Sequence, residues 1–317
     1  MSTNVLKYTS KLTGKNILVF GGTSGIDFCV AEASLEYGAT VTISSSNPSR
    51  LSTALSRLRT SYPSSSITGY TCDVSDLSDL STLEENLTTL LDKVTENGAK
   101  KIDHIAFTAG DALSLPIVKN VTPTTLFSLA NVRFVAPIFI AKLIPSYMSL
   151  APASSFTITG GVNSSKPAPG WAIAAAWGSA IEGLMRGLTV DLAPMRVNVV
   201  VPSAVKTEIF ERLGTERMET VLKDYAIQTT VGDIGKPEDV AETYLYAMKD
   251  QFVTGSVLES NGGRLLVYMD FREGKPALPV HNVVMKLEFV QSSVFCVLCL
   301  VSRVRDFKMR GSPCGFL

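Results

Sequence analysis

A glycine-rich run, GGTSGID at residues 21–27, is the segment whose residue types and spacing indicate chemistry most directly. It follows a short apolar stretch typical of a strand and precedes a pattern typical of a helix. Glycines at a strand-to-helix turn let backbone N–H groups approach a pyrophosphate, and the helix N-terminus adds partial positive charge. We therefore interpret the run as a dinucleotide site. The predicted contacts come from Gly21, Thr23, Ser24 and Ile26.

The tip of the second predicted strand indicates which dinucleotide binds. Ser45 and Ser46 end this strand, Arg50 follows closely, and the tip carries no Asp or Glu. An acidic residue there would bond both ribose hydroxyls of NAD, whereas hydroxyls and an arginine accommodate a 2′-phosphate. NADP is therefore the predicted cofactor. The alternative is that Arg50 is a solvated residue in the first turn of a helix.

Short β-branched runs alternate with longer helix-like stretches between residues 16 and 259. Strands are expected at 16–20, 39–44, 67–72, 102–108, 155–159, 196–201 and 256–259. Helices are expected at 26–37, 48–61, 76–95, 124–150, 171–191 and 237–248. Such alternation implies right-handed crossovers and a parallel sheet that is covered on both faces. The predicted fold class is α/β, a Rossmann-like doubly wound parallel sheet with three α/β/α layers.

Composition excludes several classes of partner. The 317 residues are 45% hydrophobic, and 29 basic residues balance 29 acidic ones, which argues against a nucleic acid or a membrane surface as partner. There is no long apolar run and no secretory signal pattern, so we expect a cytoplasmic protein. Only His104 and His281 are present, which argues against a histidine base. Cys296 and Cys299 form an isolated CxxC, and no metal site is predicted.

Domain organisation follows from where the alternation ends. Residues 1–265 are predicted to form a single nucleotide-binding and catalytic domain, in which the long segment 206–230 covers a ligand. Residues 266–317 lose the pattern and form an atypical C-terminal tail. This tail is a real extension, a membrane-touching segment, or a disordered product of alternative splicing, and we favour the last interpretation.

Further segments make the chain resemble the short-chain dehydrogenase/reductase family. The matching residues are Asp73 and Val74 after the third strand, Ala109 and Gly110 after the fourth, and Pro202, Val205 and Thr207 after the sixth. The resemblance implies that the first pair contacts adenine and that Val205 and Thr207 contact the nicotinamide amide. Asp27 stands where the family has its third glycine, and a carboxylate there would repel a phosphate unless it points away.

The residues that the family uses for alcohol chemistry are missing. Alignment puts Ala174 at the catalytic Tyr position, Gly178 at the Lys position, and Gly160 or Gly161 at the Ser position. Asn131, which in the family supports a water relay to the Lys, is retained. Without the Tyr and the Lys, reversible alcohol oxidation loses its acid and base.

Two residues suggest what replaces that chemistry. Arg133 lies in an otherwise apolar stretch, where it can hold an enolate or amide oxygen, and Trp171 can stack on an aromatic substrate. The alternatives are an Arg paired with a surface acid and a Trp that fills the core. With SSNPSR at 45–50 and Asn131, these residues resemble the fungal reductase/Diels–Alderase branch of the family, which acts in malbrancheamide- and paraherquamide-type indole alkaloid biosynthesis.

The resemblance to this branch implies an NADPH-dependent reductase in fungal secondary metabolism. Its small-molecule substrate would be an iminium-type prenylated indole alkaloid intermediate, with or without a coupled intramolecular [4+2] cycloaddition. Ala168 stands near the position of an Asp in that branch. The alternatives are a noncatalytic nucleotide-binding pseudoenzyme and a cofactor-free cyclase. The family also implies a homo-oligomer, either a dimer or a tetramer.

Overall fold

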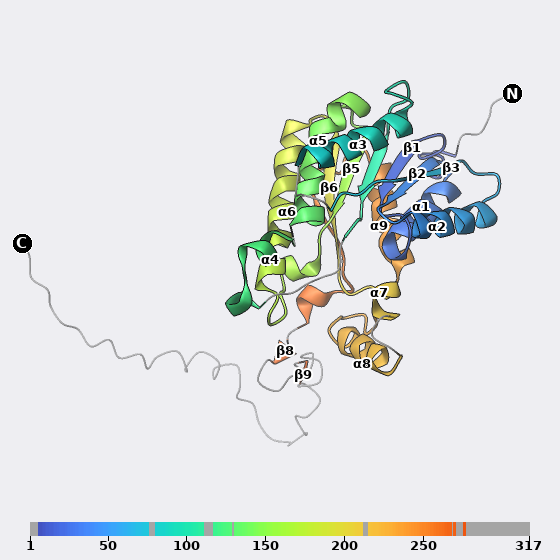
Figure 1. The fold of residues 1–317 in the computed structure, drawn as a ribbon. Coiled ribbons are helices and arrows are strands. Elements are labelled where there is room, and N and C mark those ends of the chain that lie inside the picture. The colour runs from blue at the N-terminus through green and yellow to red at the C-terminus, as the bar shows by residue number, and fades with distance from the viewer. Residues whose placement is uncertain are drawn as a thin grey trace, which may run out of the picture. The chain divides into compact units, whose positions relative to one another are not determined.

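The computed structural model describes residues 6–75, 80–110, 117–128, 130–211, 215–267, 269–270 and 275–276. Its main sheet has seven parallel strands in the order β3-β2-β1-β4-β5-β6-β7 (Figure 1). The strands are β1 (Asn16–Phe20), β2 (Thr40–Ser45), β3 (Ile67–Thr71), β4 (His104–Phe107), β5 (Ser155–Thr159), β6 (Arg196–Pro202) and β7 (Val257–Ser260). The chain reverses its direction of travel across the sheet between β1 and β4, where ligands bind in such folds.

Helices cover both faces of the sheet. One layer comprises α3 (Leu80–Thr95), α5 (Ala136–Tyr147) and α6 (Ala172–Asp191). The other comprises α1 (Gly25–Glu36), α2 (Pro48–Ser61) and α9 (Pro237–Lys249). The predicted three-layer α/β/α class is therefore confirmed.

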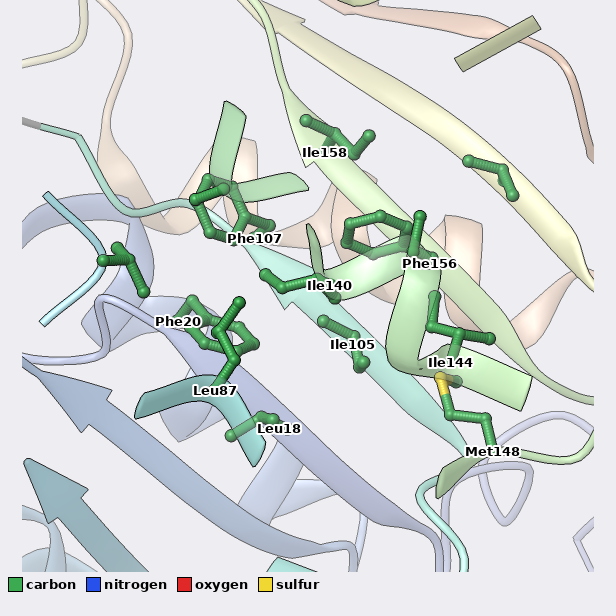
Figure 2. Close-up of a cluster of buried hydrophobic side chains, with 14 of the residues drawn as sticks. Leu18, Phe20, Leu87, Ile105, Phe107, Ile140, Ile144, Met148, Phe156 and Ile158 are labelled. Atoms are coloured by element: carbon green, nitrogen blue, oxygen red, sulfur yellow. The ribbon is translucent and has the colours of Figure 1, made fainter. Parts of the chain in front are cut away.

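Alternation along the strands explains this layering. On β1, Leu18 and Phe20 belong to the core on the α3/α5/α6 side, whereas Ile17 and Val19 belong to the core on the other side. Figure 2 shows the first core, in which Leu87 of α3 and Ile140 of α5 lie among the side chains of the strands. Because both strand faces are buried, β1 and β6 are mostly apolar, and the polar strand residues that are buried elsewhere are small hydroxyl side chains such as Thr42 and Ser155.

The helix expected at 124–150 is a wrong prediction, because the structure divides it. It contains α4 (Pro123–Ser128), the π-helical η2 (Asn131–Val135) and α5. The backbone N–H of Val135 bonds the carbonyl of Ala130, and that of Ala136 bonds Asn131, each five residues back. Pro137 follows and has no N–H to continue the pattern. A single π-helical turn of this kind often lies at a functional site. We call residues 131–135 the π-turn.

The segment after β6 contains two further helices, α7 (Glu208–Glu211) and α8 (Thr215–Ala226). Shorter elements are η1 (Val118–Asn120), η3 (Val162–Ser164), η4 (Arg264–Leu266) and the antiparallel pair β8 (Met269–Asp270) and β9 (Lys275–Pro276). The first compact unit spans Met1–Pro276. Most of the predicted tail, including the whole second unit Ala277–Leu317, lies outside the described residues. Within the described part of the chain, every helix is too short or too polar to span a bilayer.

Candidate nucleotide and substrate site

The glycine run forms a tight turn between β1 and α1. Gly21, Gly22 and Gly25 have φ angles of 113°, 56° and 57°, a region that side chains other than glycine's rarely adopt. A Cβ atom on Gly22 would lie 2.6 Å from Cγ2 of Ile43. Ser24 is the N-cap residue of α1, yet its side chain makes no capping hydrogen bond. Ser24 therefore does not cap the N–H groups in the first turn of α1. The glycine turn and these N–H groups, which we call the nucleotide cradle, fit a pyrophosphate.

Asp27 lies against this turn. A Cβ atom added to Gly21 would lie 2.7 Å from Cγ of Asp27 and 3.1 Å from Oγ1 of Thr108. The Asp27 carboxyl hydrogen-bonds the Thr108 side chain, and burial of the carboxyl raises its pKa from 3.8 to about 7. Although part of the residue is exposed, its carboxyl is held against Gly21 of the glycine turn.

Two threonines at the ends of neighbouring strands make further polar contacts between the nucleotide turn and the sheet. Thr108 Oγ1 donates to the carbonyl of Phe20 (2.7 Å), and Thr159 Oγ1 lies 2.8 Å from the carbonyl of Phe107. The hydroxyls of Thr159 and Tyr244 are 2.6 Å apart, and burial raises the pKa of Tyr244. We call Asp27, Thr108, Thr159 and Tyr244 the polar cluster. It joins the nucleotide turn to β4, β5 and α9.

The tip of β2 presents the groups expected around a 2′-phosphate. Ser46 and Arg50 are exposed, and Ser45 is partly exposed. Asn47 caps α2 by accepting a hydrogen bond from the backbone N–H of Arg50 (2.9 Å), while Ser45 Oγ accepts from the N–H of Asn47 (3.2 Å). The hydroxyl of Ser46 and the guanidinium of Arg50 therefore reach solvent at the start of a helix.

The loops after β3 and β4 hold the next predicted contacts. The Asp73 carboxylate accepts hydrogen bonds from the N–H (2.9 Å) and the hydroxyl (2.7 Å) of Ser75, and Val74 is buried. Ala109 is partly buried and Gly110 is exposed. Asp73 is thus engaged locally in the structure.

The loop after β6 lies directly on the nucleotide turn. Pro202 ends β6, and Val205 is held by a parallel bridge to Gly235. A Cβ atom on Gly25 would lie 2.9 Å from Cγ2 of Thr207 and 3.6 Å from Oε2 of Glu208. Sequence analysis missed Glu208, although its place beside the predicted Thr207 contact could have indicated it. The Glu208 charge helps to raise the pKa of Asp27.

Two predicted catalytic residues share the π-turn. Asn131 begins η2, and its Nδ2 lies 3.5 Å from the carbonyl of Ser75. The Arg133 guanidinium lies against Gly110, where an added Cβ atom would be 2.6 Å from its Cζ. Its positive charge acts to lower the pKa of Asp27. The structure thus brings Asn131 and Arg133 to the same sheet edge as the glycine turn.

Trp171 stands at the start of α6, after a turn in which its N–H bonds the carbonyl of Ala168 (3.1 Å). Gly170 takes φ 84° there, as a type II turn requires after Pro169. A second indole, Trp177, lies beside the Arg133 segment, and sequence analysis missed it. Its ring centroid lies 5.3 Å from that of Phe134, and its Nε1 donates to the carbonyl of Leu126 (3.2 Å).

Gly178, which aligns with the family's Lys, packs against another segment of the chain. A Cβ atom on Gly178 would lie 3.1 Å from Cβ of Ser164, which belongs to η3. Ser164 Oγ bonds Oε1 of Glu182 (2.6 Å), one turn further along α6. A side chain at position 178 would therefore require Ser164 to shift, because η3 packs against α6 at this point. The described ranges hold no group of three or more metal-ligating side chains.

This packing makes a matched prediction for two glycines of α6. Gly183→Ala should raise the free energy of unfolding by about 0.5–1 kcal/mol, because nothing lies within 4 Å of its added Cβ and alanine favours helix. Gly178→Ala should give no gain or a loss of about 1 kcal/mol, because Ser164 must move. Denaturant midpoints of both variants test this. Equal stabilisation by the two changes would show that η3 does not restrict the site.

Comparison with known proteins agrees with this geometry. The chain matches the SDR-like Rossmann domain over residues 8–267 and belongs to that family, the short-chain dehydrogenases/reductases. It is 44% identical to the short-chain dehydrogenase/reductase malC of Malbranchea aurantiaca over 258 residues, covering 80% of this chain and 96% of that protein.

A second relative, fsr5 of Gibberella fujikuroi, is 38% identical over 264 residues, which cover 82% of this chain and 98% of that one. Among solved structures, the MalC reductase/Diels–Alderase from Malbranchea aurantiaca is similar, with a TM-score of 0.77 and 44% identity; the match covers 82% of this chain and 99% of that one. The resemblance drawn from the sequence is therefore confirmed.

Proposed function

We propose that the protein is an NADPH-dependent reductase of fungal secondary metabolism that delivers hydride to an iminium-type indole alkaloid intermediate. The observation that carries this proposal is a retained nucleotide cradle beside a site whose Lys position is held by Gly178, packed against Ser164. The similarity to MalC, named a reductase/Diels–Alderase, supports the same assignment and a coupled [4+2] cycloaddition.

The chemistry matches the residues that remain. An iminium carbon is already electrophilic, so hydride addition gives a neutral amine and needs no proton donor. When bound, the reduced nicotinamide supplies that hydride and leaves as the oxidised cofactor. The glycine turn would hold its pyrophosphate, and Ser46 with Arg50 would hold the 2′-phosphate of NADP.

The substrate would be positioned by side chains near the π-turn. Arg133 would donate to an amide or enolate oxygen, and Trp171 would stack on the indole. Holding a reactive intermediate in a folded pose is enough to favour cyclisation, because orientation and electrostatics lower that barrier without proton transfer. The small-molecule partner, the cytoplasmic location and the dimer or tetramer stay predictions from the sequence.

The direct test uses NADPH deuterated at C4, each epimer in turn, with a dihydro-β-carbolinium as the iminium and the matching cyclic ketone as comparison. We expect deuterium in the amine product, seen by mass spectrometry, and no reduction of the ketone. Reduction of the ketone alone would contradict the proposal, since that reaction needs the proton donor that the chain lacks.

Arg133→Gln should lower kcat/KM for a dihydro-β-carbolinium that carries an amide substituent by about 10- to 100-fold, because a charge-assisted hydrogen bond to the amide oxygen is lost. The Kd of NADPH should stay within about twofold. Arg59→Gln, at the far end of α2, is the matched control and should leave kcat/KM unchanged. Unchanged turnover in Arg133→Gln would remove this residue from the substrate site.

A second candidate is a protein that binds the nucleotide without turning it over, or a cyclase that needs none. The carboxylates of Asp27 and Glu208 on either side of the nucleotide turn favour it, as does Ala168 in place of an acidic residue. A binder would saturate with NADPH without consuming it. A cofactor-free cyclase would form product at the same rate with NADPH omitted.

A further inference from the structure

We propose that the dinucleotide binds together with one proton, which is held by Asp27 against Gly21 of the glycine turn. This inference rests on the nucleotide site assigned in the proposed function and adds a charge state to it. It explains how a chain that has an acidic residue at the third glycine position can still accept an anionic cofactor.

The Thr108 hydroxyl can bond either charge state of the Asp27 carboxyl. A threonine hydroxyl has one hydrogen, and Thr108 Oγ1 lies 2.7 Å from the carbonyl of Phe20, to which it donates. Asp27 also bonds this hydroxyl: a neutral Asp27 can donate to Thr108 while Thr108 donates to Phe20, whereas the hydroxyl donates to an ionised Asp27 and so acts to lower its pKa. An ionised Asp27 would require the hydroxyl to turn away from Phe20. Thr108 thus has two hydrogen-bond arrangements, one for each charge state of Asp27.

Three elements place charged or polar side chains around Asp27. Glu208 of α7 disfavours ionisation of the carboxyl, Arg133 of η2 favours it, and Tyr244 of α9 is a neutral phenol behind Thr159. In the free protein, burial dominates and places the pKa of Asp27 at about 7. The carboxyl is therefore divided between its two charge states near neutral pH.

A pyrophosphate bound at the turn changes this balance. It brings negative charge to the backbone N–H groups of the turn, and the Asp27 carboxyl lies against Gly21 of the same turn. Like charges so close together disfavour the ionised carboxyl, so its pKa rises on binding. Above the pKa of the free protein, binding must then include uptake of a proton. Because proton uptake and cofactor binding are linked, the cofactor Kd should increase with pH above the pKa of the free protein. The increase should approach tenfold per pH unit.

The experiment measures the Kd of NADP⁺ and NAD⁺ by tryptophan quenching at pH 6, 7, 8 and 9, alongside calorimetry at pH 7.5 in HEPES and in Tris. For the wild-type chain we expect an increase in Kd of about tenfold between pH 7.5 and 8.5, and uptake of about half a proton or more per cofactor. NAD⁺ controls for the 2′-phosphate, which titrates near pH 6 and strengthens binding as pH rises.

Three variants isolate the residue. Asp27→Asn and Asp27→Gly should both lose the rise in Kd and the proton uptake, and they should bind more tightly than wild type at pH 9. Two neutral replacements are used so that one suffices if the other misfolds. Glu36→Gln, at the other end of α1, removes a similar charge far from the turn and should behave as wild type. Glu208→Gln should keep the rise but shift it to lower pH.

Two results overturn the inference. Saturable cofactor binding by wild type with a pH-independent Kd and no proton uptake overturns it alone and leaves the reductase proposal standing. Failure of wild type, Asp27→Asn and Asp27→Gly to bind either cofactor at any pH overturns both. Binding by the neutral variants only, with none by wild type above pH 7, would support the role of Asp27.

Discussion

Replacing Arg196 with methionine should lower the free energy of unfolding by about 3–5 kcal/mol, because buried carbonyl groups lose a charged donor. Only 2% of this β6 residue is exposed. Its Nε donates to the carbonyl of Pro152 (2.6 Å) and its Nη2 to that of Met248 (2.9 Å), while Nη1 bonds the carbonyl of Ala247. Ala247 and Met248 lie in the last turn of α9, where carbonyls lack partners within the helix.

Guanidinium-induced unfolding measures this loss, and Arg59→Met on the exposed part of α2 provides the matched control. Arg196→Lys should recover part of the stability, since an ammonium can reach some of the same carbonyls but lacks the planar fork. A loss of less than about 1 kcal/mol in Arg196→Met would mean that water replaces the guanidinium at these carbonyls.

Asp27→Asn should raise the free energy of unfolding at pH 8 by about 2–4 kcal/mol and give little gain at pH 4. Burial raises the pKa of Asp27 from 3.8 to about 7 in the folded chain. Between these values the folded state binds more protons than the unfolded state. The stability of the wild type therefore falls as pH rises through this window, and the whole cost is present above pH 7. The asparagine does not titrate and escapes that cost.

Urea unfolding of wild type and Asp27→Asn at pH 4, 5.5 and 8 provides the measurement. The difference between the two should grow with pH, whereas Glu36→Gln should show no such trend. A difference that is the same at all three values would mean that the Asp27 carboxyl is solvated in the folded protein, and the role of burial would be wrong.

The sequence predicts the sheet well for a physical reason. A strand buried on both faces is mostly apolar and β-branched, and the runs at 16–20 and 196–201 show this pattern. The long helix at 124–150 was predicted wrongly because the apolar pattern of a sequence does not show where backbone hydrogen bonds change from a four-residue to a five-residue step. The five-residue step at Ala130 and Asn131 alters the backbone while Phe134 and Val135 still pack on the core.

The candidate site likewise contains residues that the sequence predicts and residues that only the folded structure reveals. Glycines that require positive φ, and a strand tip with hydroxyls and Arg50, are local signals that a sequence displays. The direction of Asp27 depends on Thr108, which lies on another strand, and Glu208 approaches Gly25 only after the chain has crossed the sheet. Lys166 likewise donates to the carbonyl of Arg264 (2.7 Å), 98 residues away. Such pairings depend on tertiary packing, which periodicity does not encode.

The contact between Gly178 and Ser164 also bears on substitutions in α6. A single substitution that introduced lysine at position 178 would meet η3, so Ser164 would have to shift to accommodate it. Packing of η3 against α6 therefore limits which side chains position 178 can accept without a change elsewhere.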